Sequence, residues 1–212
     1  MGTIVDITTS LDGFVAGPNP TLEDPLGEGG ERLHEWAVAL EAWRERHGME
    51  GGEANADSER LRESVDATGA VVMGRRMFSG GEGPWDADPN ADGWWGDDPP
   101  FRAPVFIVTS HPRGSVAKEG ETSYTFVTDG VESAVRQARA AAGEKNVGVA
   151  GGANVVQQAI KAGLVDELRL HLAPILLGSG TRLLDDLGDV ELERTAVIES
   201  PGVTHLTFRV VN

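Results

Sequence analysis

The chain has 212 residues, 40% of them hydrophobic, and no cysteine, so it suits one large domain and excludes disulfide scaffolds, thiol nucleophiles and cysteine-ligated metal sites. The 34 acidic residues against 18 Lys and Arg give a formal net charge of −16. Such a field repels phosphate backbones and anionic lipid, so neither nucleic acid nor a membrane is an expected partner. The chain has neither an apolar run near the roughly 20 residues of a membrane span nor a signal-peptide layout, which predicts a cytoplasmic protein.

The N-terminal part of the chain predicts a strand, a loop and an amphipathic helix. Residues 3–8 alternate in polarity, as in a half-buried strand, and a loop rich in Gly, Pro and acids extends over 10–31. One helix is predicted over 31–47, because its apolar residues recur at helical spacing. These residues are Leu33, Trp36, Leu40 and Trp43.

A short helix, a strand and a long acidic loop are expected next. Asp57 is the expected N-cap of the helix and Gly69 its end, and the apolar strand covers 70–73. The loop at 79–103 carries six acids and no base between residues 82 and 98, together with Trp85, Trp94 and Trp95. Loops of this length are usually functional or disordered, and three tryptophans favour an ordered loop that packs on something.

The second half of the chain alternates short apolar runs with helical segments, which is typical of parallel strands joined by helices. Strands are expected at 105–109, 125–128, 146–150 and 167–177, the last limited by Pro174. Helices are expected after the capping-box pair Asp129 and Glu132, and over 155–162. Residues 195–199 and 204–211 predict a closing antiparallel hairpin, so the whole pattern indicates a single mixed α/β domain.

Several motifs are absent, and this narrows the function. The sequence has no G-x-x-x-x-G-K-[ST] phosphate loop, no G-x-S-x-G nucleophile elbow, and no G-x-G-x-x-G after the first strand. The five histidines show no metal-ligand spacing, so no metal site is expected.

Three short motifs follow predicted strands and suit an anionic ligand. Gly151-Gly152 opens a helix, whose N-terminal amides can bind a pyrophosphate. Gly74-Arg75-Arg76 offers two guanidinium groups, and Thr109-Ser110-His111 offers small hydroxyls. Each motif taken alone could equally be a tight turn or a pair of solvated arginines. Together, at one sheet edge of an acidic chain, they favour a phosphorylated nucleotide.

Six segments of the chain resemble the dihydrofolate-reductase-like family, and most closely the riboflavin-biosynthesis reductase domain and its stand-alone relatives. They are SLDGFVAG at 10–17, MGRRMF at 73–78, VTS at 108–110, AGGAN at 150–154, AGLVDEL at 162–168 and APILLG at 173–178.

The resemblance implies an α/β fold with a mixed, mostly parallel sheet of about eight strands, flanking helices and a C-terminal antiparallel hairpin. It spans 1–212 as one domain, with insertions at about 18–60 and 79–103. It further implies a homodimer that binds NADPH and transfers hydride to a small heterocycle, similar to 5-amino-6-(5-phosphoribosylamino)uracil reductase or dihydrofolate reductase. The alternative is a non-catalytic NADP(H)- or nucleotide-binding protein that kept the fold.

The resemblance also assigns residues. The cofactor-binding residues that it implies are Thr8, Gly17, Gly74, Arg75, Arg76, Thr109, Ser110, Gly151, Gly152, Ala153, Asn154 and Val155. The chain has Met77 in place of a family threonine and Ala150 in place of a substrate-binding glutamate, and Glu31 and Glu35 are its candidates for the helix carboxylate.

Two further residue groups have open interpretations. Asp12 is the catalytic candidate, contacting substrate or relaying a proton, although an Asp-Gly turn explains it as well. Trp94 and Trp95 could form a lid over the substrate or a subunit interface, because aromatic residues are enriched in both.

Overall fold

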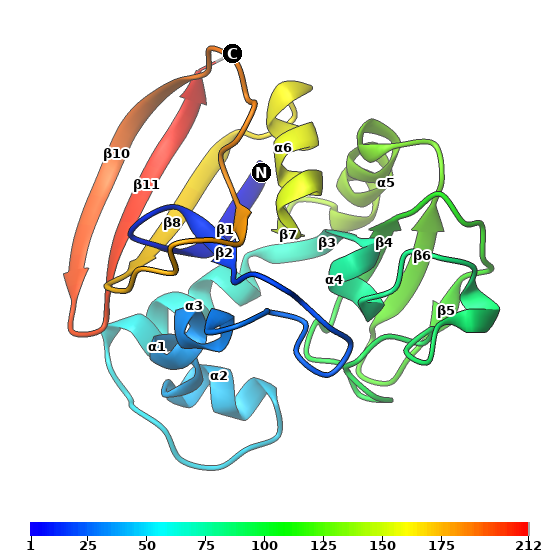
Figure 1. The fold of residues 1–212 in the computed structure, drawn as a ribbon, viewed down its shortest axis with the longest axis horizontal. Helices are drawn as coiled ribbons and strands as arrows, with labels where there is room; N and C mark the ends of the chain where they lie inside the picture. Colours follow the sequence, from blue (N-terminus) through cyan, green and yellow to red (C-terminus); the bar gives the residue numbers. More distant parts are fainter. Residues whose placement is uncertain (212) are drawn as a thin grey trace.

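The computed structural model, which describes residues 1–211, is built around a nine-stranded sheet in the order β10-β11-β8-β1-β7-β3-β4-β6-β5 (Figure 1). The strands are β1 (Thr3–Ser10), β3 (Thr68–Gly74), β4 (Pro104–Val108), β5 (Val116–Ala117), β6 (Ser123–Val127), β7 (Asn146–Gly151), β8 (Glu167–Ala173), β10 (Glu191–Ser200) and β11 (Val203–Val211). A separate two-stranded ribbon pairs β2 (Phe14–Ala16) with β9 (Thr181–Arg182).

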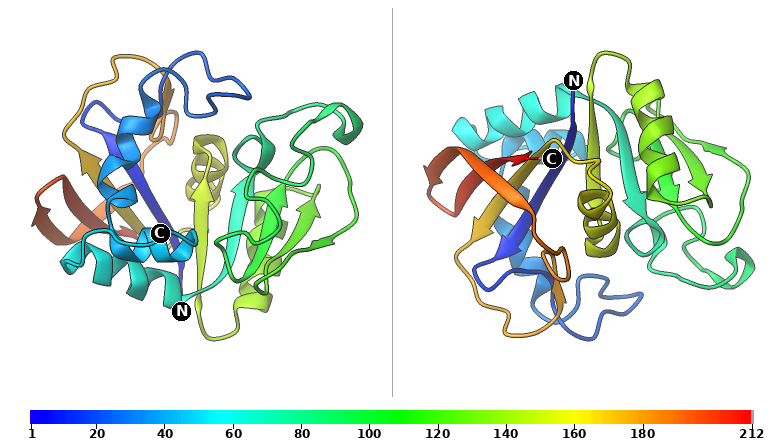
Figure 2. Two further views of the ribbon diagram at one scale, coloured as in Figure 1. Left: turned by 90° about the horizontal axis from the view of Figure 1, so that it is seen from below. Right: turned by 90° about the horizontal axis from the view of Figure 1, so that it is seen from above.

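The helical elements lie in two groups along the chain. The first group is η1 (Gly30–His34), α1 (Glu35–Val38), α2 (Glu41–Arg46) and α3 (Ala56–Asp66). The second group is α4 (Arg75–Ser79), η2 (Trp85–Ala87), α5 (Val131–Ala142) and α6 (Ala153–Lys161). Figure 2 shows the first group beside β1 and β8, away from the green strands β4 and β6.

Strand direction confirms the predicted fold class. The neighbours β8, β1, β7, β3, β4 and β6 all pair in parallel, so their carboxyl ends meet at one edge of the sheet. The antiparallel pairs are β11 with β8, β10 with β11, and the short β5 with β6. The closing hairpin is therefore confirmed and is longer than predicted, and β8 ends at Ala173, directly before Pro174.

Side-chain alternation divides the core between two faces of the sheet. Ala70 and Val72 pack with α5 and α6, whereas Val71 and Met73 face the opposite cluster around Phe78. A central strand buried on both faces needs this continuous apolar run. Helix α5 meets the first face with a buried stripe at helical spacing, consisting of Val131, Ala134, Val135, Ala138 and Ala142.

The single helix predicted over 31–47 is wrong. The chain forms η1, α1 and α2 there, and Leu40 interrupts them with extended backbone at φ −73° and ψ 141°. The Leu40 side chain is nevertheless buried, as the periodicity required. A break at Leu40 turns α2 toward α3, where the Ser58 hydroxyl accepts a hydrogen bond from the Ala42 amide. Tertiary packing thus overrides the local helical pattern.

Three predicted helix boundaries also need correction. Asn55, and not Asp57, caps α3, because its side chain accepts from the amides of Asp57 and Ser58. Gly69 lies inside β3 and does not end α3. The N-cap of α5 is Gly130, and Asp129 makes no side-chain capping bond.

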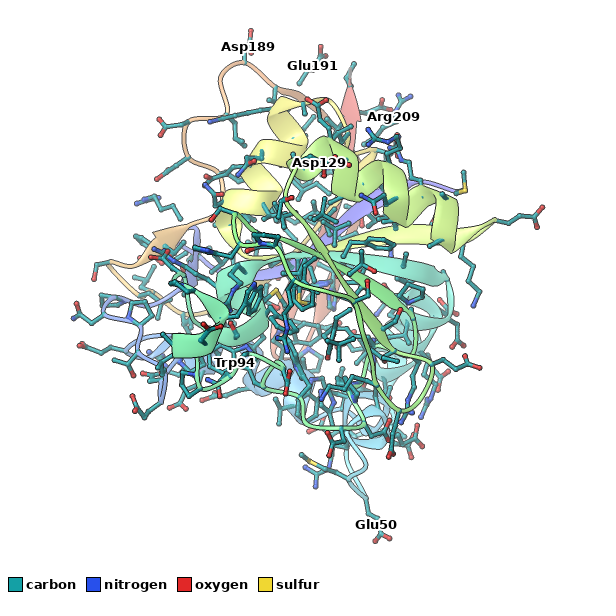
Figure 3. All side chains as sticks on the ribbon, turned by 90° about the vertical axis from the view of Figure 1, so that its right-hand side faces the viewer. Glu50, Trp94, Asp129, Asp189, Glu191 and Arg209 are labelled. Atoms are coloured by element: carbon teal, nitrogen blue, oxygen red, sulfur yellow. The ribbon has the colours of Figure 1, made fainter. Side chains whose placement is uncertain are left out.

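The loop at 79–103 is ordered by aromatic packing, as its tryptophans predicted. Trp85 and Trp95 contact the Phe78 ring at centroid distances of 6.1 and 6.4 Å. The Trp94 indole donates to the Met77 carbonyl at 2.6 Å, which places it beside α4 (Figure 3). Within residues 1–211, no helix has the length and apolarity to cross a membrane.

We predict that Phe78→Ala destabilises the protein by about 3–5 kcal/mol, because Phe78 is fully buried and contacts four aromatic rings. Urea unfolding monitored by circular dichroism measures the loss. Phe78→Leu, which preserves most of the volume, should cost less than half as much. A Phe78→Ala variant as stable as the parent protein would show that the ring contacts do not stabilise the loop.

Candidate functional site

The carboxyl ends of β1, β7 and β3 bring glycine backbone and small side chains together. A methyl group built on Gly74 would lie 3.0 Å from Val155 Cγ2 and 3.6 Å from the Gly152 amide nitrogen. On Gly151, which has φ +126°, it would lie 3.4 Å from Met77 Sδ and 3.8 Å from Ile7 Cδ1. The sheet edge thus joins four of the predicted residues, namely Gly74, Gly151, Gly152 and Val155.

Strands β1 and β7 diverge at this edge. They pair only from Thr3 to Val5, opposite Val147 to Val149, whereas β1 stays paired with β8 as far as Ser10. The last residues of β1 therefore run free of β7, and the Gly151-Gly152 turn lies beside the point of divergence. The peptide bond between Gly151 and Gly152 is cis.

The α6 N-terminus next to this turn has free donors in the Ala153 and Asn154 amides, whereas the Val155 amide donates to the Gly152 carbonyl at 3.0 Å. Gly152 is the N-cap and supplies no side-chain oxygen to the first amides of the helix. Ala153 and Val155 are buried, whereas Asn154 is exposed and its side-chain oxygen accepts from Gln158. Unpaired amides and the positive end of a nine-residue helix suit an anion.

Arg75 is buried beneath residues 79–103, which we call the acidic loop. Its side chain is 7% exposed, and its Nη1 lies 2.5 Å from Oδ2 of Asp88, whose side chain is 3% exposed. The guanidinium carbon sits 3.5 Å from the Trp85 ring centroid. All three guanidinium nitrogens are buried without a hydrogen-bond partner of good geometry, so Nη1 meets Asp88 as an ion pair. Arg75 therefore keeps unused donors although it is paired.

Burial raises the pKa of Asp88, but hydrogen bonds from Ser79, the Asn90 amide and Arg75 outweigh it and hold that pKa below its ordinary value. The carboxylate is thus ionised at neutral pH and neutralises Arg75. This pairing was not predicted from the sequence, although six uncompensated acids in one loop beside two arginines are a usable signal for it.

The acidic loop pairs with two more arginines in the same region. Arg76 pairs with Glu82 on the exposed surface, and Arg113 lies 2.5 Å from Asp92. Arg113 also stacks 5.1 Å from the Trp85 ring that covers Arg75. Each of these three arginines therefore already has a carboxylate from the loop, and an external anion would compete with those carboxylates.

The remaining predicted cofactor residues have different surroundings. Thr109 is buried directly after β4 and accepts from the His111 amide, while Ser110 is exposed. Thr8 is buried in β1 and accepts from the Trp36 indole at 3.3 Å. A methyl group on Gly17 would collide with the Glu28 carbonyl. Gly17 is thus explained by loop packing.

Asp12 holds the loop after β8. Its carboxylate accepts from Ser10 Oγ at 2.6 Å, from the Gly178 amide at 2.7 Å and from the Leu177 amide at 3.2 Å. The Ser10 bond is the main cause that lowers the pKa of Asp12 to about 2, against the opposing effect of burial. Asp12 is therefore ionised at neutral pH, which does not suit the proton relay predicted for it and favours the turn interpretation.

A hydrogen-bonded chain of four titratable groups lies on the face of the sheet covered by α1 and α3. It links Asp6 of β1, His171 of β8, His205 of β11 and Asp57 of α3. This chain was not predicted from the sequence, although the alternation in 167–173 places His171 and Arg169 on one strand face. Neither Glu31 nor Glu35 joins this chain, and the buried helix carboxylate is Asp57, at 7% exposure.

A mixed sheet with six parallel strands, a glycine turn at its carboxyl edge and a closing antiparallel hairpin defines a dihydrofolate-reductase-like α/β fold. The sequence assigns the chain within that class: it belongs to the RibD C-terminal domain family, whose model matches residues 3–206.

Solved structures agree with this fold. A putative riboflavin biosynthesis protein from Shewanella sp. PV-4 is 22% identical with a TM-score of 0.60, and all of both chains is covered. Riboflavin biosynthesis reductase Rib7 from Saccharomyces cerevisiae is 15% identical with a TM-score of 0.53, over 100% of this chain and 89% of that one. Dihydrofolate reductase from Enterococcus faecalis, complexed with NADP(H), is 14% identical with a TM-score of 0.52, over 100% and 97%. At these identities the likeness establishes the fold alone. A search of curated protein sequences found no match.

We predict that Asp88→Asn lowers the free energy of unfolding by about 3–5 kcal/mol, because it leaves the Arg75 charge buried without a counter-charge. Inorganic pyrophosphate should restore part of this loss by supplying the missing anion, so its addition should raise the melting temperature more in the variant than in the parent protein. Asp86→Asn, an exposed change in the same loop, is the matched control. Equal pyrophosphate effects in all three proteins would contradict an anion site at Arg75.

We predict that Asp12→Asn lowers the melting temperature at neutral pH without changing ligand affinity. The folded-state pKa of about 2 is depressed, so the carboxylate stabilises the fold above its unfolded pKa near 3.8, and this stabilisation disappears as pH falls toward 2. Thermal melts of parent and variant should therefore converge in acid. A difference that persists at pH 2 would argue against the charge of Asp12 as the cause.

Proposed function

We propose that this RibD C-terminal-type domain is an NADPH-dependent reductase that transfers hydride to a small heterocyclic substrate. The observation that carries the proposal is the convergence of Gly74, Gly151-Gly152 and the α6 N-terminus at the divergence of β1 and β7. Open α/β sheets bind nucleotides at such an edge, where backbone can approach a phosphate closely.

Two groups of residues suit a dinucleotide: the glycine turn with the α6 amides, and the side chains after β3 and β4. The glycine turn and the free α6 amides leave room for a phosphate to approach, because no atom lies within 4 Å of a methyl group built on Gly152. Arg75 retains unpaired Nε and Nη2 donors for a further phosphate oxygen. Arg76, Thr109 and Ser110 would complete the phosphate contacts, and the 2′-phosphate is the reason to propose NADPH over NADH.

When bound, NADPH supplies the hydride, and the protein supplies orientation and dry surroundings. The α6 amides would hold the pyrophosphate, and the buried end of β1 at Thr8 would border the reacting end of the cofactor. Thr8 is buried and in contact with Trp36, and both features would exclude water from the reacting end of the cofactor. Because Asp12 is ionised and engaged by the 177–178 amides, no proton transfer is assigned to it.

The substrate class rests on the relatives. The matching structures carry the names of a riboflavin biosynthesis protein, a riboflavin biosynthesis reductase and a dihydrofolate reductase, which supports a pyrimidine- or pteridine-like heterocycle. Ala150, in place of the glutamate that the resemblance implies, argues for a substrate that differs from that of the riboflavin pathway.

A second candidate is a non-catalytic NADP(H)- or nucleotide-binding protein. The observation in its favour is that Arg75, Arg76 and Arg113 are each paired with an acid of the loop, which weakens the site for a tightly held phosphate. Oxidation of NADPH in the presence of a panel of pterins, pyrimidines and carbonyl compounds separates the two candidates.

A homodimer is also part of the proposal, and light scattering on the purified protein tests it.

We predict that Gly152→Ala weakens NADPH binding by at least tenfold while leaving the melting temperature unchanged. The new methyl group meets no protein atom within 4 Å, so the fold tolerates it, but it occupies the position at which a pyrophosphate would approach the α6 amides. Calorimetric titration with NADPH and with NADH measures both the affinity and the preference.

Gly83→Ala is the matched control, because Gly83 also has open space around its Cα and lies outside the glycine turn. It should bind NADPH like the parent protein. Equal affinity in the Gly152 variant would remove the turn from the site, and a parent protein that binds neither cofactor would overturn the reductase proposal.

A further inference from the structure

The Asp6–His171–His205–Asp57 chain consists of three consecutive hydrogen bonds. Asp6 Oδ1 lies 2.5 Å from His171 Nε2, the two Nδ1 atoms of His171 and His205 lie 2.7 Å apart, and His205 Nε2 lies 3.1 Å from Asp57 Oδ1. The chain is largely sheltered, with side-chain exposures of 31% for Asp6, 18% for His171 and 8% each for His205 and Asp57.

The geometry specifies how many protons the chain holds. Each of its three links joins two atoms that carry lone pairs, so each link needs one proton. Two neutral imidazoles between two ionised carboxylates provide only two protons. If each ring donated its one proton to its carboxylate, the two Nδ1 atoms would face each other at 2.7 Å with a lone pair on each and no proton between them. The chain therefore requires a third proton, and its total charge is −1 in place of −2.

The charges around the chain accommodate this state. Arg60 lies 2.9 Å from Asp57, and Arg169 lies 3.6 Å from Asp6 and 2.6 Å from Glu167. The Ser64 hydroxyl donates to Asp6 and the Ser200 hydroxyl donates to Asp57. With the third proton, the chain and Glu167 together carry two negative charges, which equal the two positive charges of Arg60 and Arg169. At Asp6, Ser64 and Arg169 engage the outer Oδ2, whereas at Asp57 both Arg60 and Ser200 engage Oδ1, the oxygen that also faces His205.

The third proton belongs to the histidine pair. Burial by itself raises the pKa of Asp6. The hydrogen bond and charge of His171, together with Ser64 and Arg169, outweigh burial, so the pKa is lowered overall and the carboxylate stays ionised. Burial and the charge of His171 lower the pKa of His205, which disfavours a fourth proton. The proton count therefore places one positive charge on the histidine pair as a whole.

The histidine pair is also the surface on which Trp36 packs. The Trp36 ring centroid lies 5.1 Å from that of His171 and 5.4 Å from that of His205. From this position its indole donates to Thr8, the β1 residue that lies opposite His171 in the strand register. Separation of the rings would therefore displace Trp36 and its bond to Thr8.

We propose that His171 and His205 share one proton between their Nδ1 atoms, and that this shared proton positions Trp36 against Thr8 at the end of β1. The pair acts on the proposed cofactor site through Trp36 and Thr8, so its residues are positioning residues. This second part rests on the proposed function, whereas the proton count does not.

The consequence is a pH window. In acid, protonation of both Nδ1 atoms places two donors face to face, and because the pKa of His205 is lowered, the folded state resists this proton and loses stability as pH falls below the ordinary histidine value near 6.5. In base, loss of the shared proton leaves two facing lone pairs. Trp36 should hold its bond to Thr8 only between these limits.

Nitrogen-15 NMR of the full chain, from about pH 5 to about pH 9, tests the proton count directly. The expected result is three protonated nitrogens on the two rings and a nitrogen–nitrogen coupling across the Nδ1 pair. The Trp36 indole N–H signal, assigned with Trp36→Phe, should move at both limits of the window. Two neutral rings without coupling, or a Trp36 signal that ignores the loss of the proton, would overturn the proposal.

His205→Asn is the conservative variant, because its amide oxygen can still accept from His171 Nδ1 but does not titrate. It should keep the Trp36 signal in place and remove its shift in acid. His171→Phe removes the proton and should displace the signal at every pH, and His47→Gln, outside the chain, is the matched control. A Trp36 signal unchanged in His171→Phe would contradict positioning by the pair.

NADPH titrations at the same pH values separate this proposal from the proposed function. Affinity in the parent protein should fall by roughly tenfold outside the window and should lose its acid dependence in His205→Asn. Absence of binding at every pH would contradict the proposed function while leaving the NMR result decisive for the shared proton. Binding that is independent of pH would overturn the link between the pair and the site.

Discussion

The candidate site depends on one constraint: β1 pairs in parallel with β8 from Ile4 to Ser10, but with β7 only from Thr3 to Val5. It brings the carboxyl ends of the strands to one edge and lets β1 and β7 separate there. The alternation of β1 then sends Val5 into the core with α5 and α6, and Asp6 and Thr8 to the opposite face. One strand thereby contributes to the packed core, the glycine edge and the histidine chain.

Two electrostatic arrangements, one after β3 and the other on β1, each hold a charge away from water. Arg75 is neutralised by Asp88 and covered by Trp85, so the acidic loop supplies the anion that an external phosphate would otherwise provide. The histidine pair is compensated by Asp6 and Asp57 at its two ends. Buried charges persist only when paired and hydrogen-bonded, and each pair therefore ties a distant segment to the sheet.

Much of the fold could be predicted from the sequence, because it depends on local patterns. Apolar runs such as 70–73, glycine and proline stops, and the closing hairpin define the strands and their order of appearance, and the resemblance adds the arrangement of the sheet. The prediction failed where long-range packing overrides local preference. Leu40 is buried as predicted, but its backbone is extended and interrupts the helix. Asn55 caps α3 because its backbone is extended there, and residue spacing in the sequence does not determine backbone angles.

The fold class, the family and the glycine turn at Gly151-Gly152 follow from the residues alone, since these features reside in contiguous segments whose chemistry can be read in order. The folded chain was needed to show that Arg75 is paired with Asp88, that Asp12 holds the 177–178 turn, and that His171 meets His205. These contacts join residues 13, 166 and 34 positions apart. Their formation depends on the sheet register and on loop packing, which local sequence patterns do not determine.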